Sequence, residues 1–148
     1  MILLEEFEQV QLIQDLDPEH LQKVAVAAEL REFLENETIF RERELSSYTF
    51  IILEGEVELS FQTQAGKVPI QVLGSGDLLG WSSILCQGRM TATARAISRC
   101  RVAALNVRKL LEQFDDDPKF GLEFVLRVAM ALALRLTATR RRLVDKPS

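Results

Sequence analysis

The chain has few residues that can serve as metal ligands, redox centres or general bases. Its 148 residues include two cysteines, Cys86 and Cys100, and one histidine, His20. Two thiols in a chain with no recognisable signal sequence indicate reduced residues of a cytoplasmic protein. No cluster of His, Cys, Asp or Glu has metal-ligand spacing. We expect His20 to be solvated beside Glu19. The sequence therefore argues against an enzyme.

Long apolar runs and an excess of positive charge are also absent. The longest apolar stretch, 120–136, is interrupted by Glu123, Arg127 and Arg135, whereas a membrane helix needs about 20 predominantly apolar residues. The acidic N-terminus MILLEEFEQV does not resemble a secretory signal. A net charge of −4 argues against a general nucleic-acid surface. We therefore expect no membrane association and no direct DNA binding.

The remaining composition is that of an ordinary globular protein. Hydrophobic residues make up 47% and charged residues 27% of the chain. The length fits a single domain over residues 1–148. Helical spacing of apolar residues covers 1–30, short runs with a period of two cover 31–106, and helical spacing returns over 107–144. Many short strands without intervening helices predict a sandwich or barrel, mainly β with flanking helices.

Local signals place the helix boundaries. Asp17 is a candidate N-cap with Pro18 at the first helical position, which predicts a helix to about Glu29. After the strands, the pattern predicts a short helix over 107–114 and, beyond a run of aspartates, a long helix over 119–144.

The most distinctive segment is GSGDLLGWSSILCQGRMTATARA, residues 74–96. It reads as a turn, a tight step at 79–80, a very short helix from Ser82, a polar loop and an alternating strand. The start of a helix presents free backbone N–H groups to an anion, and Ser82 and Ser83 add hydroxyl donors. The glycine spacing also approaches a dinucleotide fingerprint, but no parallel βαβ unit surrounds it. The segment therefore predicts a phosphate-binding cassette.

Four pieces in the correct order resemble the cyclic nucleotide-binding domain of the catabolite-activator (Crp/Fnr-like) family. They are DLDPE at 15–19, FIILEGEVEL at 50–59, GDLLG at 76–80 and TATARA at 91–96. The resemblance covers about 12–143. It implies a jelly-roll with N-terminal helices and a long C-terminal dimerisation helix, as a bacterial, stand-alone module without a helix-turn-helix domain.

Two cassette positions depart from that family. Its nucleotide-binding members place a glutamate, which bonds the ribose, where this chain has Trp81, and an arginine, which neutralises the cyclic phosphate, where it has Met90. Arg89 lies one residue earlier, so it faces the opposite side in a strand but could turn inward in a loop. Two lost charge-assisted bonds, each about 1.5–3 kcal/mol, weaken binding by on the order of 10² to 10⁴-fold. Trp81 either stacks on a base or fills the ribose space.

The resemblance implies cAMP or cGMP as the candidate ligand, held between the cassette and the long helix. Thr139 on that helix aligns with the hydroxyl residue that touches the purine in relatives. The candidate ligand-binding residues are Leu79, Gly80, Trp81, Ser82, Ser83, Arg89, Met90, Thr91, Ala92 and Thr139.

The long helix carries two apolar rows. The first has the 4-3-4-3-4 spacing of a coiled-coil seam, and the second lies toward another face. The seam consists of Val125, Ala129, Leu132, Leu136, Thr139 and Leu143, and the second row of Leu122, Leu126, Met130 and Leu134. One row can pack on the barrel, and the other then needs a partner. This favours a homodimer over a monomer that buries the whole helix.

Two functional hypotheses follow. The first is a non-catalytic regulatory module, homodimeric and cytoplasmic, that binds a small anionic ligand and signals through its C-terminal helix. The second is an interaction or dimerisation module with a vestigial pocket and an unknown partner protein. Trp81 and Met90 motivate the second hypothesis.

Overall fold

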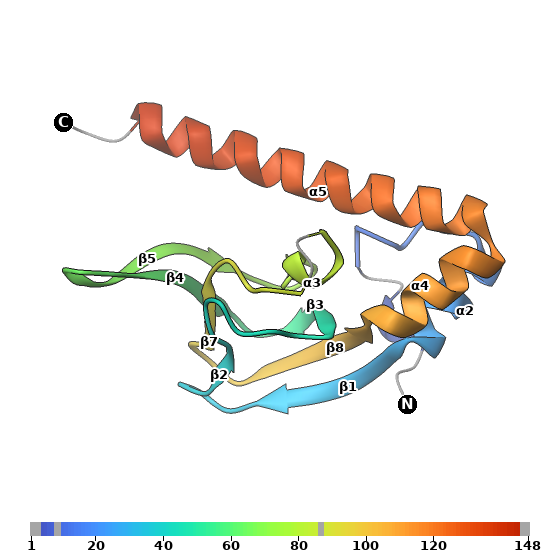
Figure 1. The fold of residues 1–148 in the computed structure, drawn as a ribbon, viewed down its shortest axis with the longest axis horizontal. Coiled ribbons are helices and arrows are strands. Elements are labelled where there is room, and N and C mark those ends of the chain that lie inside the picture. The colour runs from blue at the N-terminus through green and yellow to red at the C-terminus, as the bar shows by residue number, and fades with distance from the viewer. Residues whose placement is uncertain (1–3, 8–9, 86–87, 146–148) are drawn as a thin grey trace.

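The computed structural model describes residues 4–7, 10–85 and 88–145, and it consists of two four-stranded antiparallel sheets with helices packed at one end (Figure 1). The strand orders are β1-β8-β3-β6 and β2-β7-β4-β5. The strands are β1 (Ala28–Phe33), β2 (Thr38–Phe40), β3 (Tyr48–Glu54), β4 (Val57–Thr63), β5 (Gly66–Leu73), β6 (Leu78–Leu79), β7 (Thr93–Ala96) and β8 (Cys100–Asn106). The helices are α1 (Leu4–Phe7), α2 (Pro18–Val26), α3 (Ser82–Leu85), α4 (Val107–Asp116) and α5 (Pro118–Asp145). The expected jelly-roll with flanking helices is confirmed.

The N-terminal region departs from the prediction of continuous helix over 1–30. The helix begins at Pro18 as expected, but it ends at Val26, and β1 begins at Ala28. The prediction of a helix to Glu29 is therefore wrong. The cause is tertiary: every residue of β1 pairs with β8, from Ala28 opposite Leu105 onward, and this pairing outweighs the local helical preference.

The C-terminal helices follow the predicted boundaries closely. The side chain of Asn106 accepts a hydrogen bond from the Lys109 N–H and so caps α4. Asp117 separates the two helices, and its Oδ1 accepts from the Phe120 N–H at 3.2 Å. From there α5 continues for 28 residues, roughly 42 Å.

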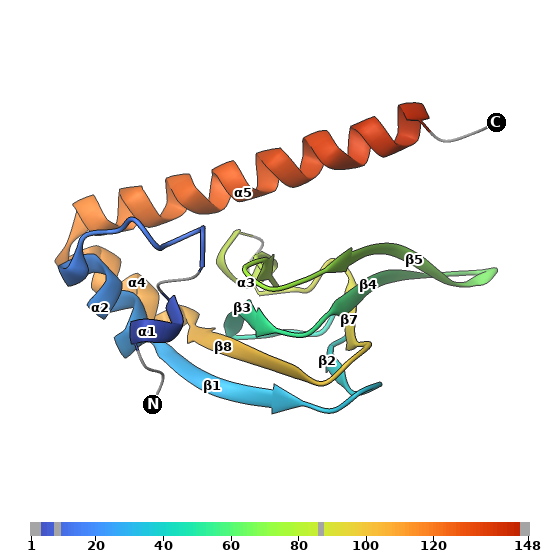
Figure 2. The same ribbon diagram turned by 180° about the vertical axis from the view of Figure 1, so that it is seen from behind.

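The fully buried residues of α5 all lie between Phe120 and Val128. Phe120, Phe124 and Val128 are at most 1% exposed and belong to the core cluster formed with α2, α4 and β8. Further along, Leu134 is 72% and Leu143 71% exposed. Figure 2 shows α5 leaving α2 and α4 and extending over the roll toward the β4–β5 hairpin. The helix is therefore held most firmly at its N-terminal end.

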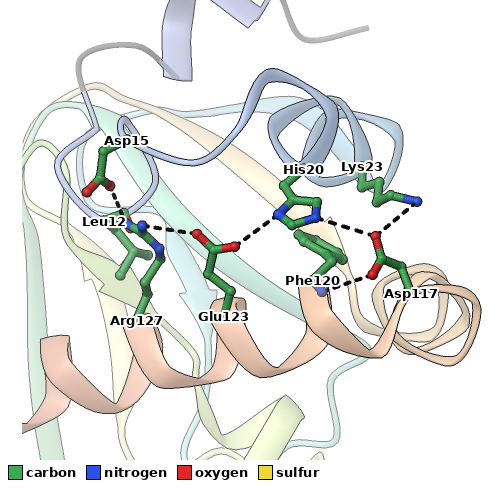
Figure 3. Close-up of polar contacts among 8 residues, drawn as sticks. All are labelled: Leu12, Asp15, His20, Lys23, Asp117, Phe120, Glu123 and Arg127. Carbon is green, nitrogen blue, oxygen red and sulfur yellow. Dashed lines mark hydrogen bonds and ion pairs between the residues drawn. The ribbon is translucent and has the colours of Figure 1, made fainter.

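A chain of polar contacts fastens that end to the N-terminal region (Figure 3). The Nδ1 of His20 lies 3.0 Å from Glu123 and its Nε2 lies 3.4 Å from Asp117. Glu123 also pairs with Arg127, which bonds Asp15. His20 is only 6% exposed, so the expectation of a solvated histidine is wrong. The reason is that α5 begins directly over α2 and covers the ring with Phe120.

This polar chain predicts a specific loss of stability in acid. The backbone N–H of Phe120, followed by Lys23 and His20, holds the pKa of Asp117 below its usual value. A depressed carboxyl pKa contributes stability above the unfolded-state pKa, and this contribution is lost as the pH falls below about 4. We expect Asp117→Asn to reduce stability at pH 7 and to flatten its decline in acid, as measured by urea unfolding between pH 7 and 3. The exposed Asp145→Asn is the control. An unchanged acid profile for Asp117→Asn would contradict this prediction.

Candidate functional site

The cassette has the expected form. Strand β6 leads through Gly80 into the four-residue helix α3. Gly80 has a φ of +75°, and a Cβ there would lie 3.2 Å from the Phe40 ring and 3.3 Å from the Phe50 ring. The turn therefore requires glycine, because it has both a left-handed backbone and aromatic neighbours in close contact. The four residues of α3 are too few to build a large helix dipole.

The two cassette serines have different roles in the structure. The hydroxyl of Ser83 donates toward the Tyr48 carbonyl at 2.7 Å and lies 2.8 Å from the Gly80 carbonyl. Its single proton is thus already used to hold α3 against β3. The hydroxyl of Ser82 lies 3.3 Å from that of Thr91. This second pair faces the cassette cavity and retains bonding capacity for a ligand.

Met90, at the position of the family's arginine, and its neighbour Arg89 point in opposite directions. Met90 is 2% exposed and belongs to the core cluster between the sheets, with its methyl group against Gly80. Arg89 is exposed, and its guanidinium donates to the Arg43 carbonyl at 3.0 Å. In this conformation Arg89 lies away from the cassette, and the uncharged, buried Met90 stands at the family's arginine position.

The cassette cavity is small. Its volume is about 20 Å³, enough for about one water molecule. Its lining residues are Phe40, Leu59, Leu79, Gly80, Trp81, Ser82, Thr91, Ala92 and Arg135. Six of the ten candidate ligand-binding residues are among them, whereas Ser83, Arg89, Met90 and Thr139 are not. A nucleotide needs far more room, so some of these lining residues would have to move to admit one.

The sequence reasoning missed three lining residues, Phe40, Leu59 and the one charged residue among them, Arg135. Arg135 reaches from α5 to the cassette, where its Nη2 donates to the Leu78 carbonyl at 2.6 Å. Burial lowers the pKa of its guanidinium, an effect that Asp77 partly offsets. Within 4–7, 10–85 and 88–145, no carboxylate lies within ion-pair distance of it. The signal for it was its place on the row of Phe124, Val128 and Ala131, which faces the body.

Thr139 lies one turn beyond Arg135 and does not line the cassette cavity. It is half-exposed, and its hydroxyl accepts from Arg142 at 3.4 Å. In this conformation Thr139 does not meet the cassette residues.

The apolar rows of α5 occupy its two flanks. A third row, with Phe120, Phe124 and Val128, packs on the body. Of the two predicted rows, the seam packs on the body in part, because Leu132 lies against the core cluster. The helix is rotated so that its phenylalanines form the most buried face. In the seam, Val125 and Leu132 are half-buried and Ala129 is exposed. Leu136 and Leu143 are 50% and 71% exposed. The second row is 54–72% exposed. Both flanks remain available to partners.

Other candidate chemistry finds little support in the part of the chain that the structure describes. No three His, Cys, Asp or Glu side chains there are grouped to hold a metal ion. Burial raises the pKa of the Cys100 thiol, whose sulfur lies 3.3 Å from the Glu56 carbonyl. Cys86 lies outside the described residues. None of the described helices is both long and apolar enough to cross a membrane.

Known proteins share this sequence pattern. Residues 30–117 match the model of the cyclic nucleotide-binding domain. A CRP-like cAMP-activated global transcriptional regulator of Mycobacterium tuberculosis is 27% identical over 135 residues, covering 90% of this chain. A cAMP-dependent protein kinase regulatory subunit of Mycosarcoma maydis is 30% identical over 104 residues, 70% of this chain. The chain spans 58% and 20%, respectively, of these two relatives' lengths.

Solved structures share the fold. A candidate cyclic nucleotide-binding protein from Geobacter metallireducens superposes with a TM-score of 0.82 at 27% identity, covering 92% of this chain and 99% of that one. The catabolite activator protein of Thermus thermophilus superposes with a TM-score of 0.73 at 25% identity, covering 89% and 61%. Together with the cassette geometry and the family match, these similarities show that the chain belongs to the cyclic nucleotide-binding domain family.

Proposed function

We propose that this chain is a non-catalytic, homodimeric regulatory module that binds a small anionic ligand between the cassette and α5 and signals through α5. The observation that supports this most strongly is Arg135, a partly desolvated cation without a carboxylate partner among the described residues. It lines the cassette cavity and joins the long helix to β6. An anion bound there would gain a charge-assisted bond and would contact both elements at once.

The chemistry of the cavity suits a cyclic nucleotide only in part. The hydroxyls of Ser82 and Thr91 can form hydrogen bonds with a ligand. Arg135 carries a positive charge, which the cassette otherwise lacks because Met90 stands at the position of the family's arginine. If Trp81 is among the lining residues that move, its indole can then stack on a base. Because Trp81 and Met90 replace the family's glutamate and arginine, we expect weak binding and a ligand preference different from that of relatives that carry both residues.

Signalling follows from how α5 is held. Its fully buried residues end at Val128, Arg135 ties it to the Leu78 carbonyl, and the residues beyond lie largely exposed over the roll (Figure 1). A ligand that pulls Arg135 toward the cassette would therefore bias the angle of the helix, and a dimer along the seam would transmit that bias to the partner copy. The cAMP-activated regulator and the kinase regulatory subunit among its relatives are regulatory proteins of this general kind.

Calorimetric titration with cAMP and cGMP, up to millimolar concentration, tests this proposal. We expect dissociation constants between about 10 µM and 1 mM, reflecting the loss of two charge-assisted bonds. Thr91→Val should weaken binding about 3- to 10-fold. Thr137→Val is the matched control, because that hydroxyl bonds only within α5, to the Ala133 carbonyl. Trp81 fluorescence should change with the same midpoint.

The second candidate function is an interaction or dimerisation module whose pocket is vestigial. The cavity of about 20 Å³ favours it, because Trp81 then fills the ligand space permanently. Absence of heat at millimolar nucleotide, with indole fluorescence unchanged and the dimer intact, would reject the sensing proposal in favour of this one.

A further inference from the structure

A second and much larger hollow lies on the other side of Arg135. It is a groove of about 800 Å³ between α5, the segment from the end of β5 to β6, and the loop at 11–15. Small-molecule sites commonly measure about 300–1,000 Å³. Arg135 lines both this groove and the cassette cavity. The groove is therefore adjacent to the cassette but distinct from it.

Polar and charged residues line part of the groove, and its remaining walls are aliphatic. On α5 they are formed by Leu126, Met130 and Leu134, which are 54%, 66% and 72% exposed, and on β5 by Val72, 51% exposed. These side chains contribute little to the fold in this form. None of the residues that line the groove is aromatic, so a nucleobase would find no ring to stack on. A saturated chain matches these walls better, and the flexible Met130 can adapt to it.

Two arginines line the groove, and of these Arg135 has no carboxylate partner among the described residues. Arg127 is already neutralised by Asp15 and Glu123. The Oδ2 of Asp77 accepts from the Gly74 N–H at 2.8 Å, and neither of its oxygens comes within ion-pair distance of Arg135. Arg135 itself donates to the Leu78 carbonyl and retains further N–H groups. A half-buried cation in this situation is stabilised by an anion beside it.

We propose that this groove is a second ligand site, for an amphipathic anion such as a linear aliphatic carboxylate. The carboxylate would pair with the Arg135 guanidinium, and the chain would lie along Leu126, Met130 and Leu134. This proposal does not depend on whether a cyclic nucleotide binds the cassette. Because the ligand would lie between α5 and the body, it would also shift the largely exposed part of the helix.

Titration of the full chain with decanoate, below its micellar concentration, tests the site. We expect a dissociation constant of about 10–1000 µM. Met130→Glu, which places a carboxylate in the apolar wall, should weaken binding at least 10-fold, and Arg135→Met should do the same. Leu111→Glu is the matched control, because Leu111 is 48% exposed on α4, outside the groove. It should leave affinity unchanged.

Several outcomes would overturn this inference. Equal affinity of the Met130→Glu and parent chains would place decanoate elsewhere. Equal affinity for decanol would remove the role of Arg135. A Met130→Glu chain that becomes monomeric while the parent is dimeric would show that a second copy covers the groove. Thr91→Val separates the two sites, because it should weaken cyclic nucleotide binding and leave decanoate binding intact.

Discussion

Gly55→Ala is expected to lower the free energy of unfolding by about 3 kcal/mol or more. Gly55 lies in the turn between β3 and β4, with a φ of +98°. A Cβ there would lie 2.4 Å from the Arg99 carbonyl oxygen and 2.7 Å from the Cys100 sulfur. Backbone at the start of β8 cannot withdraw without breaking its pairing with β1 and β3. Strain in the turn and overpacking therefore add together.

Gly66→Ala is the control that separates these two causes. Gly66 has a φ of +115°, and no atom lies within 4 Å of the position that a Cβ would take, so this variant reports the backbone cost alone, about 1–2 kcal/mol. Urea unfolding of the two variants at pH 7 gives the comparison. If both cost the same, the close approach of Gly55 to β8 contributes nothing, and the turn relaxes.

The sequence predicted the architecture well because the jelly-roll is built from local signals. Strand β3 contains the continuous apolar run 50–53, strand β4 contains Val57 and Leu59, and the intervening turn falls at Gly55. The break before the long helix follows from an aspartate that caps its first turn. In each case neighbouring residues determine the conformation, so no knowledge of distant contacts is needed.

The wrong predictions have the opposite cause, because they concern residues whose structure depends on contacts far along the chain. β1 forms where helix was expected because β8, more than 60 positions away, supplies its hydrogen bonds. His20 is buried because Phe120 and Glu123 approach it from the far end of the chain. Neither contact leaves a trace in the local pattern.

The candidate site shows the same division. The glycine step and the short helix of the cassette were readable from 76–85, since turn geometry restricts which residues fit there. The role of Arg135 could not be predicted in the same way, because it depends on which face of α5 is turned toward the body. Nor could sequence give the size of the cassette cavity, which depends on how far Trp81 and its neighbours fill the space.

Leu136→Glu is expected to convert a dimer of this chain into monomers. Leu136 is 50% exposed at the seam of α5, and a two-fold axis parallel to the helices would bring it against its own copy. Two apposed, desolvated carboxylates cost several kcal/mol, so the dimer dissociation constant should rise more than 100-fold. Sedimentation velocity over micromolar concentrations measures this. Leu111→Glu, on α4, should leave the dimer unchanged.

The seam and the second row make different predictions, which allows the dimer interface to be assigned. If the seam is the interface, Leu136→Glu dissociates the protein, whereas Met130→Glu, on the opposite flank, does not. A dimer that survives Leu136→Glu but not Met130→Glu would instead place the partner in the groove beside Arg135. That result would contradict both the seam and the carboxylate site. Each copy would then lie against the partner's Arg135, which also bonds the Leu78 carbonyl beside the cassette. Dimerisation and ligand binding would therefore act on the same side chain.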